Sequence, residues 1–178
     1  MSIAHDILPE CFVDTNIVNT FLTMEGIYVD ANHCHGCNKV GSMMQKLKDE
    51  FALGVIDNDK KQHSYNSQFY SLGKTEHLEL LKHSSKHHYL IRVSPAMDGF
   101  ILEVAERQKI DMSDYDLPDK LKDFTEITKD AKAKDSKNLK RLFKDMAGDD
   151  EMKILKKILG YIYKNKYDCD EKVVSSFL

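Results

Sequence analysis

Four short apolar runs constrain the fold more than any other feature of this sequence. They are rich in β-branched and aromatic residues and lie at Cys11–Val13, Ile27–Val29, Phe51–Ile56 and Tyr89–Val93. An apolar run without polar alternation is typical of a strand that is buried on both faces, as in a parallel sheet covered by helices. The runs therefore predict a mainly parallel, four-stranded sheet in the first two thirds of the chain.

The segments between these runs have the patterns of helices. Three of them are predicted to be helical: Asn16–Met24, Lys39–Glu50 and Thr75–His83. In the second, apolar residues recur at i, i+3, i+4 and i+7 from Val40 to Leu47, which gives one apolar face. Ser94 and Pro95 are typical of a helix N-cap and first turn, and they predict a further helix that ends near Gln108. Strands separated by helices indicate βαβ units.

Charge and pattern both change near residue 118. Residues 1–117 carry 17 acidic and 11 basic side chains, whereas residues 118–166 carry 9 acidic and 14 basic ones. The later part has no strand pattern, only helical segments near 118–130, 137–146 and 150–165. We therefore predict an α/β domain at 1–117, folded as a three-layer sandwich, and a helical extension at 118–178 packed on or beside it.

Composition excludes several classes of protein. No run approaches the ~18 consecutive apolar residues of a membrane span, and no basic segment precedes an apolar stretch at the N-terminus. Four cysteines are too sparse for a disulfide scaffold, so we expect reduced thiols and a cytoplasmic location. The net charge of −3 excludes a globally basic nucleic-acid coat. The lysines of 120–166 could form a nucleic-acid-binding face, but acids interleave with them as on an ordinary solvated helix surface.

Acids follow two of the predicted strands. Asp14 comes directly after the first, and Asp57 and Asp59 come after the third. Since the carboxyl ends of adjacent parallel strands meet at one sheet edge, the three carboxylates are expected to converge there. Such oxygen ligands suit Mg²⁺ or Mn²⁺, and a metal at this edge could support phosphodiester hydrolysis. The alternative is that these aspartates are turn formers and helix caps.

The layout of these acids resembles the Toprim catalytic domain of topoisomerases, primases and overcoming-lysogenization-defect nucleases. The resemblance covers roughly residues 10–108 and rests on Asp14, on Asp57-Asn58-Asp59 and on a glycine-containing turn at Gly36 and Gly41. It implies that the Asp-x-Asp pair binds Mg²⁺ and that the first acid, Asp14, shares the metal or transfers a proton. The family's first acid is normally glutamate, and this chain departs from that pattern with an aspartate, whose side chain is one methylene shorter: it can ligate a metal but has less reach for proton transfer.

A second resemblance competes with the first. Phe12-Val13-Asp14-Thr15-Asn16-Ile17-Val18 is similar to the opening strand of PIN-domain ribonucleases, in which Asp14 would be the first metal-binding aspartate. An Asp-x-Asp pair directly after a third strand is not the PIN pattern. Both resemblances imply divalent-metal chemistry on nucleic acid, and a non-catalytic α/β protein-interaction module is the alternative of a different class.

A histidine- and cysteine-rich segment, His33-Cys34-His35-Gly36-Cys37, follows the second predicted strand. We expect this loop at the same sheet edge as the acids, with His33 and His35 meeting substrate phosphate. Lys39, at the start of the next helix, and Lys60, after the acid pair, are assigned the same substrate-binding role. The alternatives are an ordinary polar loop and a zinc site, although zinc usually takes two well-spaced pairs of ligands.

Overall fold

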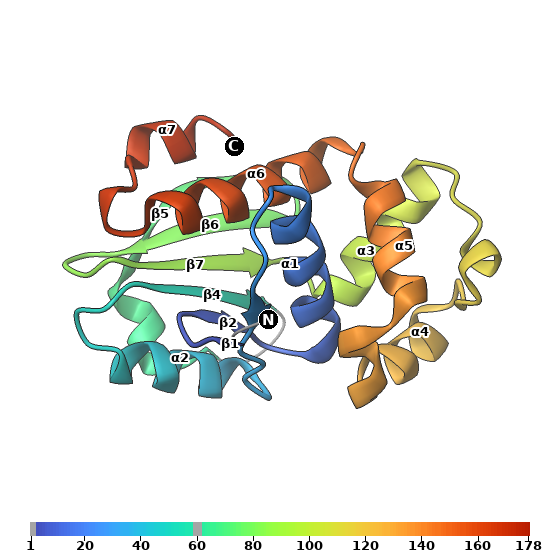
Figure 1. Cartoon of the computed structure of the whole chain (residues 1–178), viewed down its shortest axis with the longest axis horizontal. Helices are drawn as coiled ribbons and strands as arrows, with labels where there is room; N and C mark the ends of the chain where they lie inside the picture. The colour runs from blue at the N-terminus through green and yellow to red at the C-terminus, as the bar shows by residue number, and fades with distance from the viewer. Residues whose placement is uncertain (1–2, 59–61) are drawn as a thin grey trace.

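The computed structural model describes residues 3–58 and 62–178, and these form an α/β fold (Figure 1). Its main sheet has five strands in the order β2-β4-β7-β6-β5, and β1 and β3 form a second, two-stranded sheet. The strands are β1 (Ile3–Ala4), β2 (Ile7–Pro9), β3 (Asp30–Ala31), β4 (Ala52–Asp57), β5 (Phe69–Lys74), β6 (Leu78–His83) and β7 (His88–Val93). The α-helices are α1 (Phe12–Met24), α2 (Cys37–Lys46), α3 (Met97–Arg107), α4 (Leu121–Thr128), α5 (Lys137–Met146), α6 (Asp150–Asn165) and α7 (Glu171–Ser175).

The main sheet is mixed, so the prediction of a mainly parallel four-stranded sheet is wrong in detail. Strand β4 pairs in parallel with β2 and with β7, whereas β6 pairs antiparallel with both β7 and β5. The antiparallel half was missed because Thr75–His83, predicted to be a helix, contains β6 instead. Its leucines gain more from pairing beside buried β7 than from their local helical preference, which is a tertiary effect that propensity does not describe.

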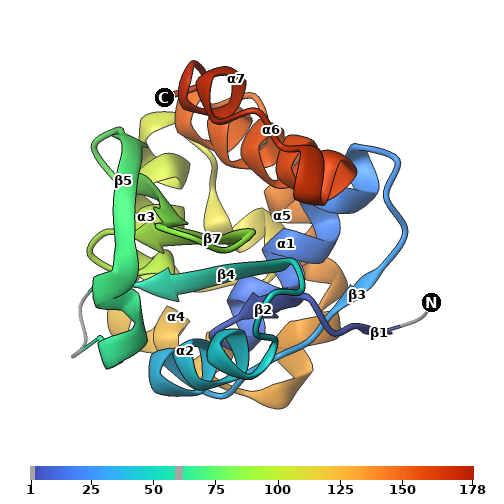
Figure 2. The same ribbon diagram turned by 90° about the vertical axis from the view of Figure 1, so that its left-hand side faces the viewer.

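Helices cover both faces of the sheet, and the strand residues alternate between two cores. Ile7, Leu53, Val55 and Ile91 face a large core that α1, α3 and α6 also build. Leu8, Ala52, Ile56 and Leu90 face a smaller core under α2. The two views agree in placing α2 and α6 on opposite sides of the sheet (Figures 1 and 2). The uninterrupted burial of β4, all six residues of it, follows from this covering on both faces.

Residues 118–178, all of which the structure describes, contain helices and no strand, as the sequence predicts. The apolar stripe of α6, from Met152 to Ile162, is buried in the large core together with α1 and α5. Asn16 of α1 donates its side-chain amide to the carbonyl oxygens of Ala133 (2.7 Å) and Ser136 (3.1 Å). The extension thus packs directly on the helix that follows the first strand of the main sheet.

The beginning of the chain differs from the sequence prediction by one element. Cys11–Val13 is not a strand: Cys11 is extended, and α1 begins at Phe12. The strand lies earlier, at Ile7–Pro9, and is followed directly by Glu10. Proline has no N–H to donate to a neighbouring strand, so Pro9 is a natural end for the strand. The predicted strand at Ile27–Val29 is likewise displaced to β3.

None of the helices formed by the described residues combines the length and the apolar content that crossing a bilayer requires.

Candidate functional site

The carboxyl ends of β2 and β4 bring two acids together at one edge of the main sheet. Glu10 follows β2, and Asp57 is the last residue of β4. The backbone N–H of Asp57 donates to Oε2 of Glu10 at 3.1 Å, and the N–H of Glu10 donates to the carbonyl oxygen of Val55 at 2.9 Å. Glu10 is 1 % exposed and Asp57 is 8 % exposed. The edge therefore holds a buried pair of acids from neighbouring parallel strands.

Asp57 also fixes the start of helix α3. Its Oδ1 accepts a hydrogen bond of 2.9 Å from the backbone N–H of Met97, the first residue of α3. The next residue, Asn58, donates from its side-chain amide to the hydroxyl of Ser94, which follows β7, at 3.0 Å. Asp57 is thus positioned by its strand and by a helix N-terminus at the same time, and the negative charge is favourable at that end of the helix.

Asp14 lies behind this pair, in the first turn of α1, and its side chain is completely buried. Its Oδ2 accepts a hydrogen bond from the N–H of Cys11 at 3.0 Å, whereas its Oδ1 has no hydrogen-bond partner among the described residues. Burial raises the pKa of Asp14 well above its usual range, and the negative charge of Asp57, with a smaller contribution from Glu10, raises it further. Asp14 is therefore a helix-end residue close to the acid pair, and not the acid at the end of the first strand.

The third predicted acid, Asp59, lies outside the described residues, as does Lys60. Within residues 3–58 and 62–178, no three His, Cys, Asp or Glu side chains are grouped so as to hold a metal ion. Carboxylates are the donors that Mg²⁺ and Mn²⁺ prefer, and Oδ1 of Asp14 is a buried carboxylate oxygen without a hydrogen-bond partner among the described residues. A metal here needs a further donor, and Asp59 is the acid that the sequence supplies two residues after Asp57.

The loop with His33 and His35 lies at the same edge. The N–H groups of Cys34 and Gly36 donate to the carbonyl oxygens of Pro9 and Glu10, each at 3.0 Å, and these bonds hold the loop against the end of β2. His33 stacks on Phe12 with ring centroids 4.0 Å apart, and its Nε2 lies 3.0 Å from Nδ1 of His35.

The surroundings of His33 determine the charge of its ring. Partial burial and the nearby His35 lower the pKa of His33, so its ring is neutral at neutral pH. Lys39 is exposed in the first turn of α2. The structure thus brings His33 and His35 to the acid pair, with Lys39 on the helix that begins directly after them.

The cysteines of this segment are structural. Cys34 and Cys37 are buried in the smaller core beneath α2. Burial raises the pKa of the Cys34 thiol to about 12, so it stays protonated and is a poor nucleophile and metal ligand. The described residues hold neither a zinc site nor an activated thiolate at this position.

A second polar cluster at the same edge was not predicted. His77 precedes β6, and its two ring nitrogens lie 2.6 Å from Glu151 of α6 and 2.8 Å from Glu103 of α3. Burial lowers the pKa of His77, but the hydrogen bonds to Glu151 and Glu103 outweigh that effect and raise it overall. Arg107 adds a two-bond contact to Asp149, with distances of 2.8 and 3.0 Å. We name these residues the His77 cluster: His77, Glu103, Arg107, Asp149 and Glu151.

Glu10 and the residues of the His77 cluster escaped the sequence analysis for different reasons. Glu10 was placed before the first strand because Cys11–Val13 was assigned to that strand, although Pro9 was a signal for the strand end. The contacts of the His77 cluster join segments that are distant in the sequence: Glu103 is bonded to His77 across 26 residues and Glu151 across 74. No local pattern signals that contact.

Comparisons of this chain with protein-family models, with curated proteins and with solved structures give no match.

Proposed function

We propose that this protein is a Toprim-like, divalent-metal-dependent enzyme that acts on phosphodiesters of nucleic acid. The observation that carries the proposal is the hydrogen bond between the N–H of Asp57 and the carboxylate of Glu10. It joins acids at the ends of two neighbouring parallel strands, where the crevice of an open α/β sheet places its working groups. The first acid in this proposal is Glu10 instead of Asp14, and a glutamate directly after the first strand agrees with the resemblance better than an aspartate does.

In this proposal, Glu10, Asp57 and Asp59 hold Mg²⁺ or Mn²⁺. The bound metal would neutralise the carboxylates and polarise a phosphoryl oxygen, which would make the phosphorus atom of a phosphodiester more open to attack by water. Asp57 keeps its carboxylate oriented through the N–H of Met97. Burial of Glu10 and Asp57 removes competing water, which strengthens their electrostatic interaction with a cation.

Asp14 is a positioning residue in this scheme. Its side chain has no exposure, so it does not reach substrate, and it acts by fixing the start of α1 and by tuning the charge beside Asp57. His33, His35, Lys39 and Lys60 are proposed to contact substrate phosphate. A cytoplasmic location belongs to the same proposal and is consistent with the free thiols of the chain.

The proposal is tested by titrating Mn²⁺ into the wild type and into Glu10→Gln, Asp57→Asn and Asp123→Asn. Gln and Asn keep the hydrogen-bond acceptors that position Asp57 and helix α3. Asp123 is an exposed acid in the first turn of α4 and serves as the matched control. At a metal concentration about a hundredfold above Kd, Mn²⁺ should raise the Tm of the wild type and the control by about 5–10 °C. Neither site variant should respond, and neither should cleave labelled DNA or RNA.

The alternatives predict other outcomes of the same experiment. A PIN-like ribonuclease would lose Mn²⁺ binding in Asp14→Asn and cleave RNA, whereas the Toprim-like enzyme should still bind metal in that variant. A wild type whose melting temperature is the same with and without Mn²⁺ would refute both and favour a non-catalytic α/β interaction module.

A further inference from the structure

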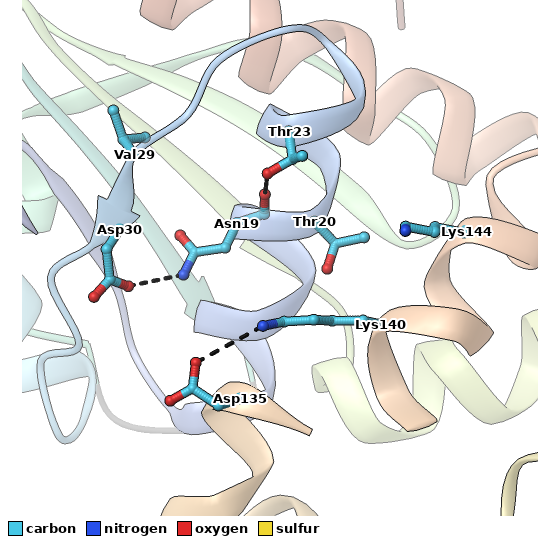
Figure 3. A pocket seen from close by; sticks show the side chains of 8 residues that line it. All are labelled: Asn19, Thr20, Thr23, Val29, Asp30, Asp135, Lys140 and Lys144. Carbon is cyan, nitrogen blue, oxygen red and sulfur yellow. Dashed lines mark hydrogen bonds and ion pairs between the residues drawn. The ribbon is translucent and has the colours of Figure 1, made fainter. Parts of the chain in front are cut away.

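A pocket of about 420 Å³ lies between α1, β3 and α5, away from the acid pair (Figure 3). Its lining comes from the second half of α1, from Val29 and Asp30, and from Asp135, Lys140 and Lys144. The volume is within the range of ~300–1,000 Å³ that small-molecule sites occupy. Its chemistry can be derived from what each polar side chain already contacts.

The lysines supply positive charge. Lys140 and Lys144 lie one turn apart on the same face of α5, and both ammonium groups point into the pocket (Figure 3). Lys140 lies 3.7 Å from Asp135, whose side chain is 81 % exposed, so water weakens that ion pair. Lys144 has no ion-pair partner in the part of the chain that the structure describes. Two ammonium groups in neighbouring turns repel each other and are stabilised by an anion between them.

The negative charge of Asp30, which lines the pocket, is already compensated by its neighbours. One oxygen of Asp30 lies 2.9 Å from Nζ of Lys134, and the other accepts from the amide of Asn19 at 2.9 Å. Burial raises the pKa of Asp30, but these two hydrogen bonds outweigh it and lower the pKa overall. The negative charge of Asp30 is thus offset by Lys134, and the balance left in the pocket favours an anionic ligand.

The threonines supply acceptors instead of donors. The hydroxyl of Thr20 lies 3.2 Å from Oδ1 of Asn16 and donates to it, and the hydroxyl of Thr23 donates to the carbonyl oxygen of Asn19 at 2.7 Å. Because their protons are used in this way, the two hydroxyl oxygens remain to accept hydrogen bonds from a ligand. A ligand that suits this lining carries an anionic group for the lysines and hydroxyl groups for the threonines.

We propose that this pocket binds a phosphate ester of a sugar or nucleoside, with Lys140 and Lys144 holding the phosphate and Thr20 and Thr23 accepting from sugar hydroxyls. The phosphate can come from a free monophosphate or from the backbone of a nucleic-acid strand. The site is separate from the acid pair, and the inference does not depend on the proposed metal chemistry.

Calorimetric titrations in EDTA test the inference, because without metal the acid pair contributes no binding. The probes are adenosine 5′-monophosphate, ribose 5-phosphate, a short oligouridylate without a terminal phosphate, and adenosine as the ligand that lacks phosphate. The double variant Lys140→Gln/Lys144→Gln is compared with Lys153→Gln/Lys157→Gln, a pair with the same spacing that is exposed on α6. A phosphate probe should bind the wild type and the α6 variant equally and the α5 variant at least about tenfold more weakly, since charge-assisted hydrogen bonds are lost.

The probes also distinguish the sources of the phosphate. Binding of the two monophosphates, with adenosine at least about tenfold weaker, would assign the pocket to a small phosphorylated ligand. Binding of the oligouridylate alone, with the same loss in the α5 variant, would assign it to a nucleic-acid backbone. No binding of any phosphate probe to the wild type, or equal weakening in the two double variants, would overturn the inference. Both results are independent of whether Glu10 and Asp57 bind metal.

Discussion

Two groups of carboxylates lie at the same edge of the main sheet, and they differ in the contacts that the structure gives their side chains. In the His77 cluster, Glu103 and Glu151 each contact a ring nitrogen of His77, and Arg107 contacts Asp149 with two hydrogen bonds. In the acid pair and its neighbour, Asp14 has a buried oxygen without a partner among the described residues. The first group carries its own cations and acts as a structural joint, whereas in the second the acids raise the pKa of Asp14, as is common at binding sites.

The His77 cluster connects three elements of the fold: β6, α3 and α6. His77 lies at the start of β6 and stacks on Phe100 of α3, and Glu151 belongs to the first turn of α6. Glu151 also accepts from the hydroxyl of Thr75 and from the backbone N–H of His77. Glu151 therefore connects α6 to the start of β6, and His77 connects both to α3.

The largest effect is expected from breaking that carboxylate's contacts. Glu151→Ala should lower the free energy of unfolding by about 3 kcal/mol, because His77 and Thr75 lose their partner in a mostly buried setting. Asp150→Ala, at the exposed neighbouring position, should change it by less than about 0.5 kcal/mol. Urea denaturation measures both, and similar losses in the two variants would mean that the cluster is not a joint.

A smaller effect of the opposite sign is expected at Asp14. Asp14→Asn keeps an acceptor for the N–H of Cys11 and removes a charge that burial, Asp57 and Glu10 disfavour. The metal-free protein should therefore become more stable by about 1–2 kcal/mol at neutral pH. In the wild type, the proton on Asp14 stabilises the folded state. This stabilisation is complete below the ordinary aspartate pKa of about 3.9 and is lost as the pH rises through the raised pKa of the folded state.

Thermal melts across that acidic range, with Asp123→Asn as the control, measure the difference. If Asp14→Asn is less stable than the wild type throughout, Asp14 is only a helix cap, and the contrast between the two carboxylate groups disappears.

The smallest effect is expected from the proton on His77. Because its folded pKa is raised, the stabilisation is complete below the ordinary histidine pKa of about 6.5 and is lost as the pH rises through the folded value. Each unit of difference between the two pKa values corresponds to about 1.4 kcal/mol. His77→Gln should remove this slope between neutral and alkaline pH, and His87→Gln, outside the cluster, should keep it. Denaturation curves at several pH values measure the slope; its persistence in His77→Gln would place its origin elsewhere.

The sequence predicted those elements whose stability is local or whose burial is complete. Strands β4 and β7 and helices α2, α3, α5 and α6 lie where the apolar runs and helical periodicity place them, with differences at their ends. Leu78–His83 was missed because its strand form depends on pairing with β7, and Phe12–Val13 because β-branched and aromatic residues there continue into a helix. Local patterns do not report either influence.

The candidate site was predicted in part for the same reason. Asp57 directly follows a buried apolar run, so its place at the sheet edge could be derived from the sequence, and the negative charge of Asp57 does act on Asp14. To predict Glu10, one must know where β2 ends. Moving that strand end by a few residues replaces Glu10 with Asp14 as the acid at the sheet edge. The His77 cluster and the α5 pocket depend on contacts between distant segments, which only the three-dimensional arrangement provides.

The two hydrogen bonds from Asn16 to Ala133 and Ser136 have a consequence for how this chain can be shortened. A fragment ending near residue 117 would leave the Asn16 amide without its acceptors and would expose the side of α1 that α5 and α6 cover. The same helix carries Asp14 two residues earlier, so removing the C-terminal helices would disturb the acidic edge as well. Such a fragment should lose its cooperative melting transition in calorimetry, and work on the acid pair therefore requires the C-terminal helices to be retained.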